Sequence, residues 1–183
     1  MTPAQSHARW AAVFTERVEA VPPDGWDAPS PVEGWRARDV VRHLVEWFPA
    51  FLSSGAGVRL PAVPSADDDP VAAWTAHRDN VQALLDDPAT ADLVLSNPHT
   101  GDVPLPEAVD RFYTADVFMH AWDLARATGQ DDTLDEGRCR ELYDGMAPME
   151  DVLRASGQFG GHVDVPEDAD AQTKLLALIG RRR

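Results

Sequence analysis

The amino-acid sequence predicts an all-α protein whose core is an antiparallel bundle of four long helices. Apolar residues recur at helical spacing in four segments, and Pro- and Gly-rich stretches separate these segments. A loop-rich crossover interrupts the series, and bundles of this type build their binding sites from side chains on facing helices. The four segments are residues 3–21, 36–53, 70–85 and 105–128.

The first two predicted helices have recognisable ends. Helix 3–21 stops at Pro22-Pro23-Asp24-Gly25, a combination of residues that forms turns. The second helix, 36–53, follows a Pro-rich connection. Pro49 lies inside it and is expected to kink it or to end its regular part early, because proline removes a helical hydrogen bond.

The third helix follows a loop rich in Gly, Pro, Ser and Asp over residues 55–69. It spans 70–85, and Pro70 suits its first turn because a proline there sacrifices no hydrogen bond. Residues 92–104 then show short apolar runs around a polar turn, which predicts a small hairpin or an extended excursion.

The central helix, 105–128, ends before Gly129, a residue that suits the left-handed position after a helix. A fifth helix is predicted over 134–155, interrupted by Pro148, and a last helix over 168–179. These terminal elements are expected to pack on the outside of the bundle.

Chain length favours one domain. A chain of 183 residues is long enough for one well-buried core. Residues 1–183 are therefore predicted to form a single domain, with a core bundle over 3–130 and a helical extension over 131–183. Whether it is a monomer or a homodimer stays open.

The formal charge of −15 argues against nucleic acid and against anionic membrane surfaces as partners, because both require a basic patch. No apolar stretch approaches the ~20 residues that span a bilayer. The sequence also lacks a signal peptide, so a cytoplasmic location is expected. Cys139 is the only cysteine, which excludes an intramolecular disulfide and a cysteine-based zinc site.

One stripe of the central helix carries polar residues among apolar ones. Asp116 and His120 lie one turn apart on it, and burying them costs free energy unless each finds a hydrogen bond, an opposite charge or a metal. His43 lies on the apolar face of the second helix. If the two helices are neighbours, the three residues form the ligand set of catalytic zinc, which also suits iron and does not exclude nickel.

These residue types also have ordinary structural roles. A D-x-x-x-H pair on a helix is common by chance, and a histidine on an apolar face is often a hydrogen-bonded core residue. His43 and Asp116 would then pair with backbone or Arg groups, or the candidate ligands would pair with one another. His99 and His162 fall in loops and are expected to be solvated.

Three further residues are weaker candidates. His77 or Arg78 faces the bundle from the third helix and could bind an anionic substrate or a thiol cofactor, with ordinary packing or exposure as the alternative. Asp123 lies one turn beyond His120 and could orient that ligand, or form a helix salt bridge with Arg126.

Two stretches resemble the mycothiol-dependent maleylpyruvate isomerase family, part of the DinB-like superfamily of metal-binding four-helix bundles. The first is Pro29-Ser30-Pro31-Val32-Glu33-Gly34-Trp35 with Arg38-Asp39-Val40-Val41-Arg42-His43-Leu44. The second is Asp116-Val117-Phe118-Met119-His120-Ala121-Trp122-Asp123-Leu124-Ala125-Arg126-Ala127-Thr128-Gly129. The tail, from Ser156-Gly157-Gln158-Phe159 through Val165-Pro166 to Arg181, resembles an actinobacterial-type branch.

The resemblance implies a metal, usually zinc, held by His43, Asp116 and His120. The isomerase has Glu where this chain has Asp116, so the shorter side chain must come closer to the metal or reach it through water. It also implies mycothiol as a thiol cofactor and a small electrophilic substrate, hence a thiol-dependent isomerase or S-transferase. The alternative is a non-catalytic metal-binding or stress-related module with the same ligands.

The resemblance also draws attention to the start of the second helix. The branch commonly has Ser or Thr there, whereas this chain has Arg36, a poor N-cap. Asp39 remains to favour the positive end of the helix.

Overall fold

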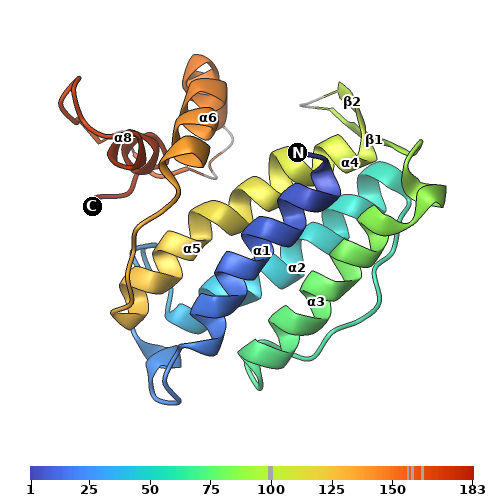
Figure 1. Cartoon of the computed structure of the whole chain (residues 1–183), viewed down its shortest axis with the longest axis horizontal. Coiled ribbons are helices and arrows are strands. Elements are labelled where there is room, and N and C mark those ends of the chain that lie inside the picture. The colour runs from blue at the N-terminus through green and yellow to red at the C-terminus, as the bar shows by residue number, and fades with distance from the viewer. Residues whose placement is uncertain (99–100, 156, 158, 162) are drawn as a thin grey trace. The chain divides into compact units, whose positions relative to one another are not determined.

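The computed structural model describes residues 1–98, 101–155, 157, 159–161 and 163–183. The chain divides into two compact units, Met1–Asp131 and Asp132–Arg183. Both are mainly helical (Figure 1). Among the described residues, no helix is long and apolar enough to cross a membrane. The loop histidines His99 and His162 lie outside the described residues.

The first unit is organised around helices that lie side by side (Figure 1). Helix α1 (Pro3–Glu19) packs against α3 (Pro70–Asp86) and α5 (Ala115–Thr128), and α2 (Ala37–Ala56) packs against the same two helices. Each helix therefore buries an apolar face between two neighbours. The fully buried side chains of these helices include Phe14, Leu44, Phe48, Trp74, Phe118 and Leu124.

Side-chain caps define where α1 and α3 begin. Thr2 caps α1 by accepting a hydrogen bond from the backbone N–H of Gln5, whose side chain accepts in return from the backbone of Thr2. Asp69 caps α3 in the same position, directly before Pro70. Helix α1 ends at Glu19, slightly before the predicted end.

Helix α2 continues through Pro49 and ends at Ala56. The expectation that Pro49 ends its regular part early is therefore wrong; the kink stays a prediction. Packing explains the continuation, because Leu52 in the turn after the proline is completely buried and its burial offsets the lost hydrogen bond. Gly57 stops the helix with a left-handed φ of 67°.

The predicted hairpin is confirmed. Strands β1 (Val94–Asn97) and β2 (Gly101–Pro104) pair antiparallel, with Leu95 opposite Val103, and both of these side chains are buried. Strand β1 lies against α2, where a Cβ on Gly55 would come within 2.9 Å of the Leu95 side chain. The short 3-10 turns of this unit are η1 (Gly25–Asp27) and η2 (Pro88–Thr90).

The central helix is continuous but not uniform. It begins as α4 (Leu105–Ala108), continues as the π-helical segment η3 (Val109–Thr114) and becomes α5. A π turn takes in one extra residue and so rotates the side chains that follow. Within this segment Tyr113 is fully buried, whereas Phe112 is only partly buried.

The second unit contains shorter helices. The predicted fifth helix is interrupted at Pro148, as expected, and α6 packs against α8. Helix α8 begins later than predicted because the side chain of Asp170 accepts a hydrogen bond from the Thr173 backbone and caps it. Cys139 is buried. The elements are α6 (Glu136–Met146), η4 (Ala147–Met149), α7 (Glu150–Ala155) and α8 (Ala171–Leu178).

Candidate metal centre

Helices α2 and α5 bring together His43, Asp116 and His120, which we call the His–Asp–His cluster. One potential ligand atom from each side chain lies within 4.8 Å of the other two. His43 Nε2 is 3.1 Å from Asp116 Oδ2, and His120 Nε2 is 3.4 Å from Asp116 Oδ1. The two imidazoles and the carboxylate therefore converge on one point between two facing helices.

Asp116 is held in its charged form. Burial by itself would raise the pKa of Asp116, but the imidazole of His120 and the hydrogen bond from His43 lower it. A hydrogen bond from the Trp47 indole acts in the same direction, and the resulting pKa lies below the usual value. The carboxylate is thus ionised and available as a ligand at neutral pH.

Trp47 is a site residue that sequence reasoning missed. Its Nε1–H donates a hydrogen bond of 3.0 Å to Asp116 Oδ2. A tryptophan among apolar residues of a helix predicts a place in the core or in a pocket wall and gives no sign of a carboxylate partner. Its position one helical turn after His43 was the available signal, because residues four apart on a helix share a face.

Asp123 orients the imidazole of His120. Its Oδ2 accepts a hydrogen bond of 2.9 Å from His120 Nδ1, and its side chain is only 1% exposed. Since Nδ1 donates to this carboxylate, Nε2 is the nitrogen that faces Asp116. Histidines that bind metals are commonly held in this way by a second carboxylate.

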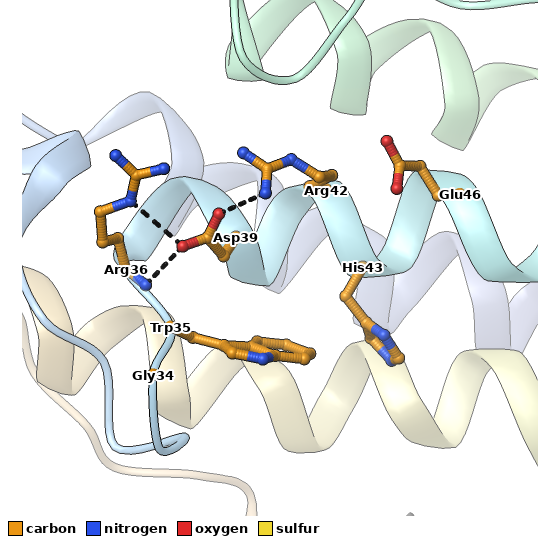
Figure 2. A pocket seen from close by; sticks show the side chains of 7 residues that line it. All are labelled: Gly34, Trp35, Arg36, Asp39, Arg42, His43 and Glu46. Carbon is orange, nitrogen blue, oxygen red and sulfur yellow. Dashed lines mark hydrogen bonds and ion pairs between the residues drawn. The ribbon is translucent and has the colours of Figure 1, made fainter.

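An open pocket of about 510 Å³ adjoins the cluster. The Trp35 ring lies 5.0 Å from the His43 ring and 5.8 Å from that of His120, measured between centroids. Figure 2 shows Trp35 and His43 on one side of the pocket. Because His43 belongs to both the cluster and the pocket wall, the cluster borders on the pocket. The pocket is lined by Gly34, Trp35, Arg36, Asp39, Arg42, His43 and Glu46.

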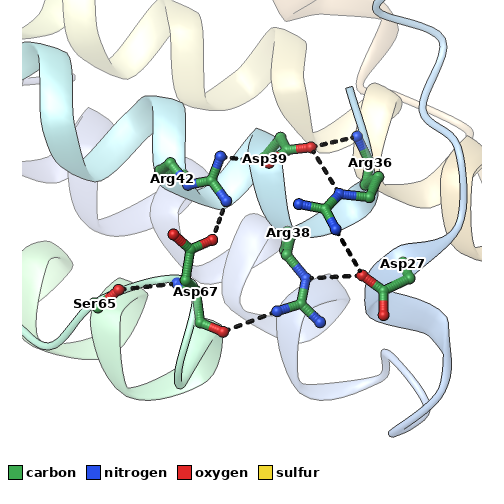
Figure 3. Close-up of polar contacts among 7 residues, drawn as sticks. All are labelled: Asp27, Arg36, Arg38, Asp39, Arg42, Ser65 and Asp67. Atoms are coloured by element: carbon green, nitrogen blue, oxygen red, sulfur yellow. Dashed lines mark hydrogen bonds and ion pairs between the residues drawn. The ribbon is translucent and has the colours of Figure 1, made fainter. Parts of the chain in front are cut away.

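Charged residues at the start of α2 connect the pocket to the loop before α3 (Figure 3). Asp39 pairs with both Arg36 and Arg42, at 3.2 Å and 2.6 Å. Arg42 also pairs with Asp67, and Arg38 donates a hydrogen bond of 2.8 Å to the backbone oxygen of Asp67. The loop is thereby tied to the first turns of the helix that carries His43.

The structure does not bring His77 and Arg78 to the pocket. His77 is buried, and its ring contacts Phe48 and Tyr113. Arg78 donates a hydrogen bond of 3.2 Å to the Thr15 hydroxyl on α1. Neither residue is among those that line the pocket.

The residues of the cluster suit a divalent metal. Two imidazoles and one ionised carboxylate are the ligands of catalytic zinc sites, and they also suit iron. His120 is oriented as a metal ligand would be, and one side of the cluster borders on a pocket. The fold and the site together describe a helical protein with a candidate metal centre between two facing helices.

Sequence comparison identifies the family. The model of the mycothiol maleylpyruvate isomerase N-terminal domain matches residues 7–125, and the chain belongs to this family. Uncharacterized proteins of two strains of Mycobacterium tuberculosis are each 29% identical to it over 184 residues, which cover 99% of this chain and 98% of the relative. No solved structure gave a significant match.

Proposed function

We propose that this protein is a DinB-like four-helix bundle that binds one divalent metal ion, zinc in the first place, through His43, Asp116 and His120. The observation that carries the proposal is the convergence of three ligand atoms within 4.8 Å beside a pocket. The same ligands suit nickel or iron, so the metal content decides between them.

The chain supplies the positioning, and the reactive thiol comes from a small molecule. Asp123 holds His120, and Trp47 holds Asp116, so that both ligands face the same point. A bound divalent ion lowers the pKa of a thiol and so supplies a nucleophilic thiolate at neutral pH. Cys139 does not serve as that thiol, because burial raises its pKa to about 12.

The reaction that fits this site is thiol addition. The thiol gives up its proton to solvent and the sulfur adds to an activated double bond of a small substrate, whose π electrons move onto the activating group. Rotation about the resulting single bond, followed by elimination of the thiolate, returns an isomer and regenerates the thiol, so that the protein would be a thiol-dependent isomerase. With a strained ring such as an epoxide, the sulfur–carbon bond forms as a carbon–oxygen bond breaks and the oxygen takes up a proton, so that the protein would be an S-transferase. The family name supports mycothiol as the thiol. The pocket beside His43 offers room for the rest of the thiol or of the electrophile.

Elemental analysis tests the metal site. Protein purified without an affinity tag or a chelator should contain nearly stoichiometric metal, which His43→Ala and His120→Ala should lose. His77→Leu removes an imidazole outside the cluster and should keep the metal. Full occupancy in both cluster variants would contradict the proposal.

Turnover distinguishes the enzyme from its alternatives. The metal-loaded protein should either isomerise an activated alkene such as maleylpyruvate in the presence of mycothiol, with no net loss of the thiol, or consume mycothiol together with an electrophile such as an epoxide. Bound metal without turnover of any such pair would favour a non-catalytic metal-binding or stress-related module. Absence of metal even after its addition would favour a metal-free cluster, held by the direct 3.1 Å contact between His43 and Asp116.

We propose further that the whole chain acts as one domain, with a core bundle over 3–130 and an extension over 131–183. The relatives support a chain in which both parts belong together, because their similarity extends over 99% of it.

A further inference from the structure

Three polar side chains outside the His–Asp–His cluster meet in the interior of the unit Met1–Asp131. They are His7 from α1, His77 from α3 and Tyr113 from η3, and they are 0%, 1% and 0% exposed. The ring centroid of Tyr113 lies 5.5 Å from that of His77 and 6.1 Å from that of His7. They therefore form a polar group inside an otherwise apolar core.

Most polar atoms of this group have no hydrogen-bond partner within the described part of the chain. These atoms are the Tyr113 hydroxyl, both ring nitrogens of His77 and Nε2 of His7. Nδ1 of His7 is satisfied, since it lies 2.8 Å from the side-chain oxygen of Gln82. Native proteins rarely leave buried polar atoms unpaired, so their concentration at one place requires an explanation.

The three side chains are uncharged at neutral pH. Burial lowers the pKa of His77 to about 4 and lowers that of His7 as well. Burial also raises the pKa of Tyr113 well above its ordinary value. Among the described residues, these histidines belong to no group of three potential metal ligands. A partner for them must be neutral, small, and able both to donate and to accept hydrogen bonds.

We propose that His7, His77 and Tyr113 surround an internal water site that joins α1, α3 and η3. Ordered water in protein interiors makes about three hydrogen bonds, so one molecule can pair with the Tyr113 hydroxyl, His7 Nε2 and one nitrogen of His77, and a second molecule would pair with the other nitrogen of His77. The neutral imidazole of His77 has one donor and one acceptor nitrogen, and the phenol can do both, so water can satisfy each of them. Tyr113 belongs to the π-helical segment η3, and its ring lies beside the rings of both histidines.

Removal of the Tyr113 hydroxyl tests the proposal, because the proposal requires this change to destabilise the protein. Tyr113→Phe keeps the ring that stacks on Phe48 at 4.2 Å but removes the group that bonds to water. In metal-free protein, the equilibrium constant for urea unfolding of this unit should rise about tenfold. An unchanged or lower constant would overturn the proposal, because removal of an unpaired buried hydroxyl does not destabilise a protein.

The readout and the control are provided by the chain itself. All six tryptophans lie before residue 132, so tryptophan fluorescence follows the unfolding of Met1–Asp131. Tyr143 is the other tyrosine and lies in the second unit, so Tyr143→Phe should leave the transition unchanged.

A crystal structure of the full chain provides a second, direct test. We expect ordered water within about 3 Å of the Tyr113 hydroxyl and of a His77 nitrogen. Well-ordered rings with no density between them, or density that refines as a metal ion, would overturn the proposal. Both tests are independent of metal at His43, so they can succeed or fail separately from the proposed function.

Discussion

At the residue scale, the chemistry of the candidate site depends on how Asp116 is held. Its Oδ1 faces His120, and its Oδ2 is shared by His43 at 3.1 Å and Trp47 at 3.0 Å. An indole N–H can only donate a hydrogen bond. Oδ2 of Asp116 is therefore an acceptor whether or not the imidazoles of His43 and His120 are protonated. Trp47 is therefore a positioning residue for the carboxylate.

Trp47→Phe should weaken metal binding by about tenfold, because loss of a partner that orients a ligand commonly costs 10- to 100-fold in affinity. Phenylalanine retains an aromatic ring beside Phe48 and Phe51. Competition against a chromogenic chelator measures the affinity. Trp10→Phe is the matched control, since Trp10 Nε1 has no hydrogen-bond partner in the described structure. Equal affinity of the Trp47 variant and the wild type would show that the indole hydrogen bond has no such role.

At the scale of the element, α2, the helix that carries His43, begins without a side-chain N-cap. Arg36 makes no side-chain capping hydrogen bond, as its poor N-cap propensity predicts. Asp39 compensates, because its Oδ2 accepts a hydrogen bond of 2.7 Å from the Arg36 backbone N–H. Burial alone would raise the pKa of Asp39, but the hydrogen bonds from Arg36 and the charge of Arg42 lower it overall.

Asp39→Ala should lower the unfolding free energy of the first unit by about 1 kcal/mol at neutral pH, the usual value of a cap. The folded pKa of Asp39 is lowered, so its stabilisation is present above the unfolded value of 3.8 and is lost as the pH falls through the folded pKa. The difference between variant and wild type should therefore shrink in acid. Urea unfolding at neutral and acid pH measures it.

Asp79→Ala is the control for this prediction. Asp79 lies on α3, and its exposed ion pair with Arg78 contributes little. A loss in Asp39→Ala no larger than that in Asp79→Ala would contradict the capping role.

At the scale of the whole molecule, burial of histidines makes stability depend on pH. The unit Met1–Asp131 encloses His7 and His77 without a neighbouring carboxylate bonded to either ring, in so far as the described residues show. A buried imidazole that stays neutral in the folded protein lowers the unfolding free energy once the pH is low enough to protonate the same imidazole in the unfolded chain. The free energy of unfolding should therefore be highest at neutral pH and should fall in mild acid.

The substitution His77→Leu should weaken the dependence of stability on pH. The pKa of His77 is 6.5 when unfolded and about 4 when folded, so the unfolded chain takes up a proton that the folded chain excludes. Wild-type stability should therefore be fully present above pH 6.5 and fall towards pH 4, with His77 contributing on the order of 3 kcal/mol to the total decline.

Urea unfolding of metal-free protein, followed by tryptophan fluorescence at several pH values across this window, measures the decline. His7 has a lowered pKa as well, so some dependence should remain in the variant. Equal slopes for His77→Leu and the wild type would show that His77 is protonated in the folded state or is not buried.

Prediction from the sequence was strongest where the signal is local. Periodicity located the long helices, and the interruptions at Pro148 and Gly129 follow from the backbone properties of those two residues. Sequence prediction failed at Pro49, where burial of Leu52 keeps the helix intact. It also did not foresee the π-helical segment η3, because one residue inserted into a turn leaves no mark in the composition of the helix.

The sequence by itself determined the helical class, the family and the residue types of the candidate site, because periodicity, caps and short motifs depend on neighbours along the chain. Only the tertiary structure decided which side chains meet. His43 and Trp47 reach Asp116 across 73 and 69 residues, and His77 faces Tyr113 instead of the pocket. Such pairings depend on how the helices pack and rotate against one another, which no signal local to one stretch of the chain encodes.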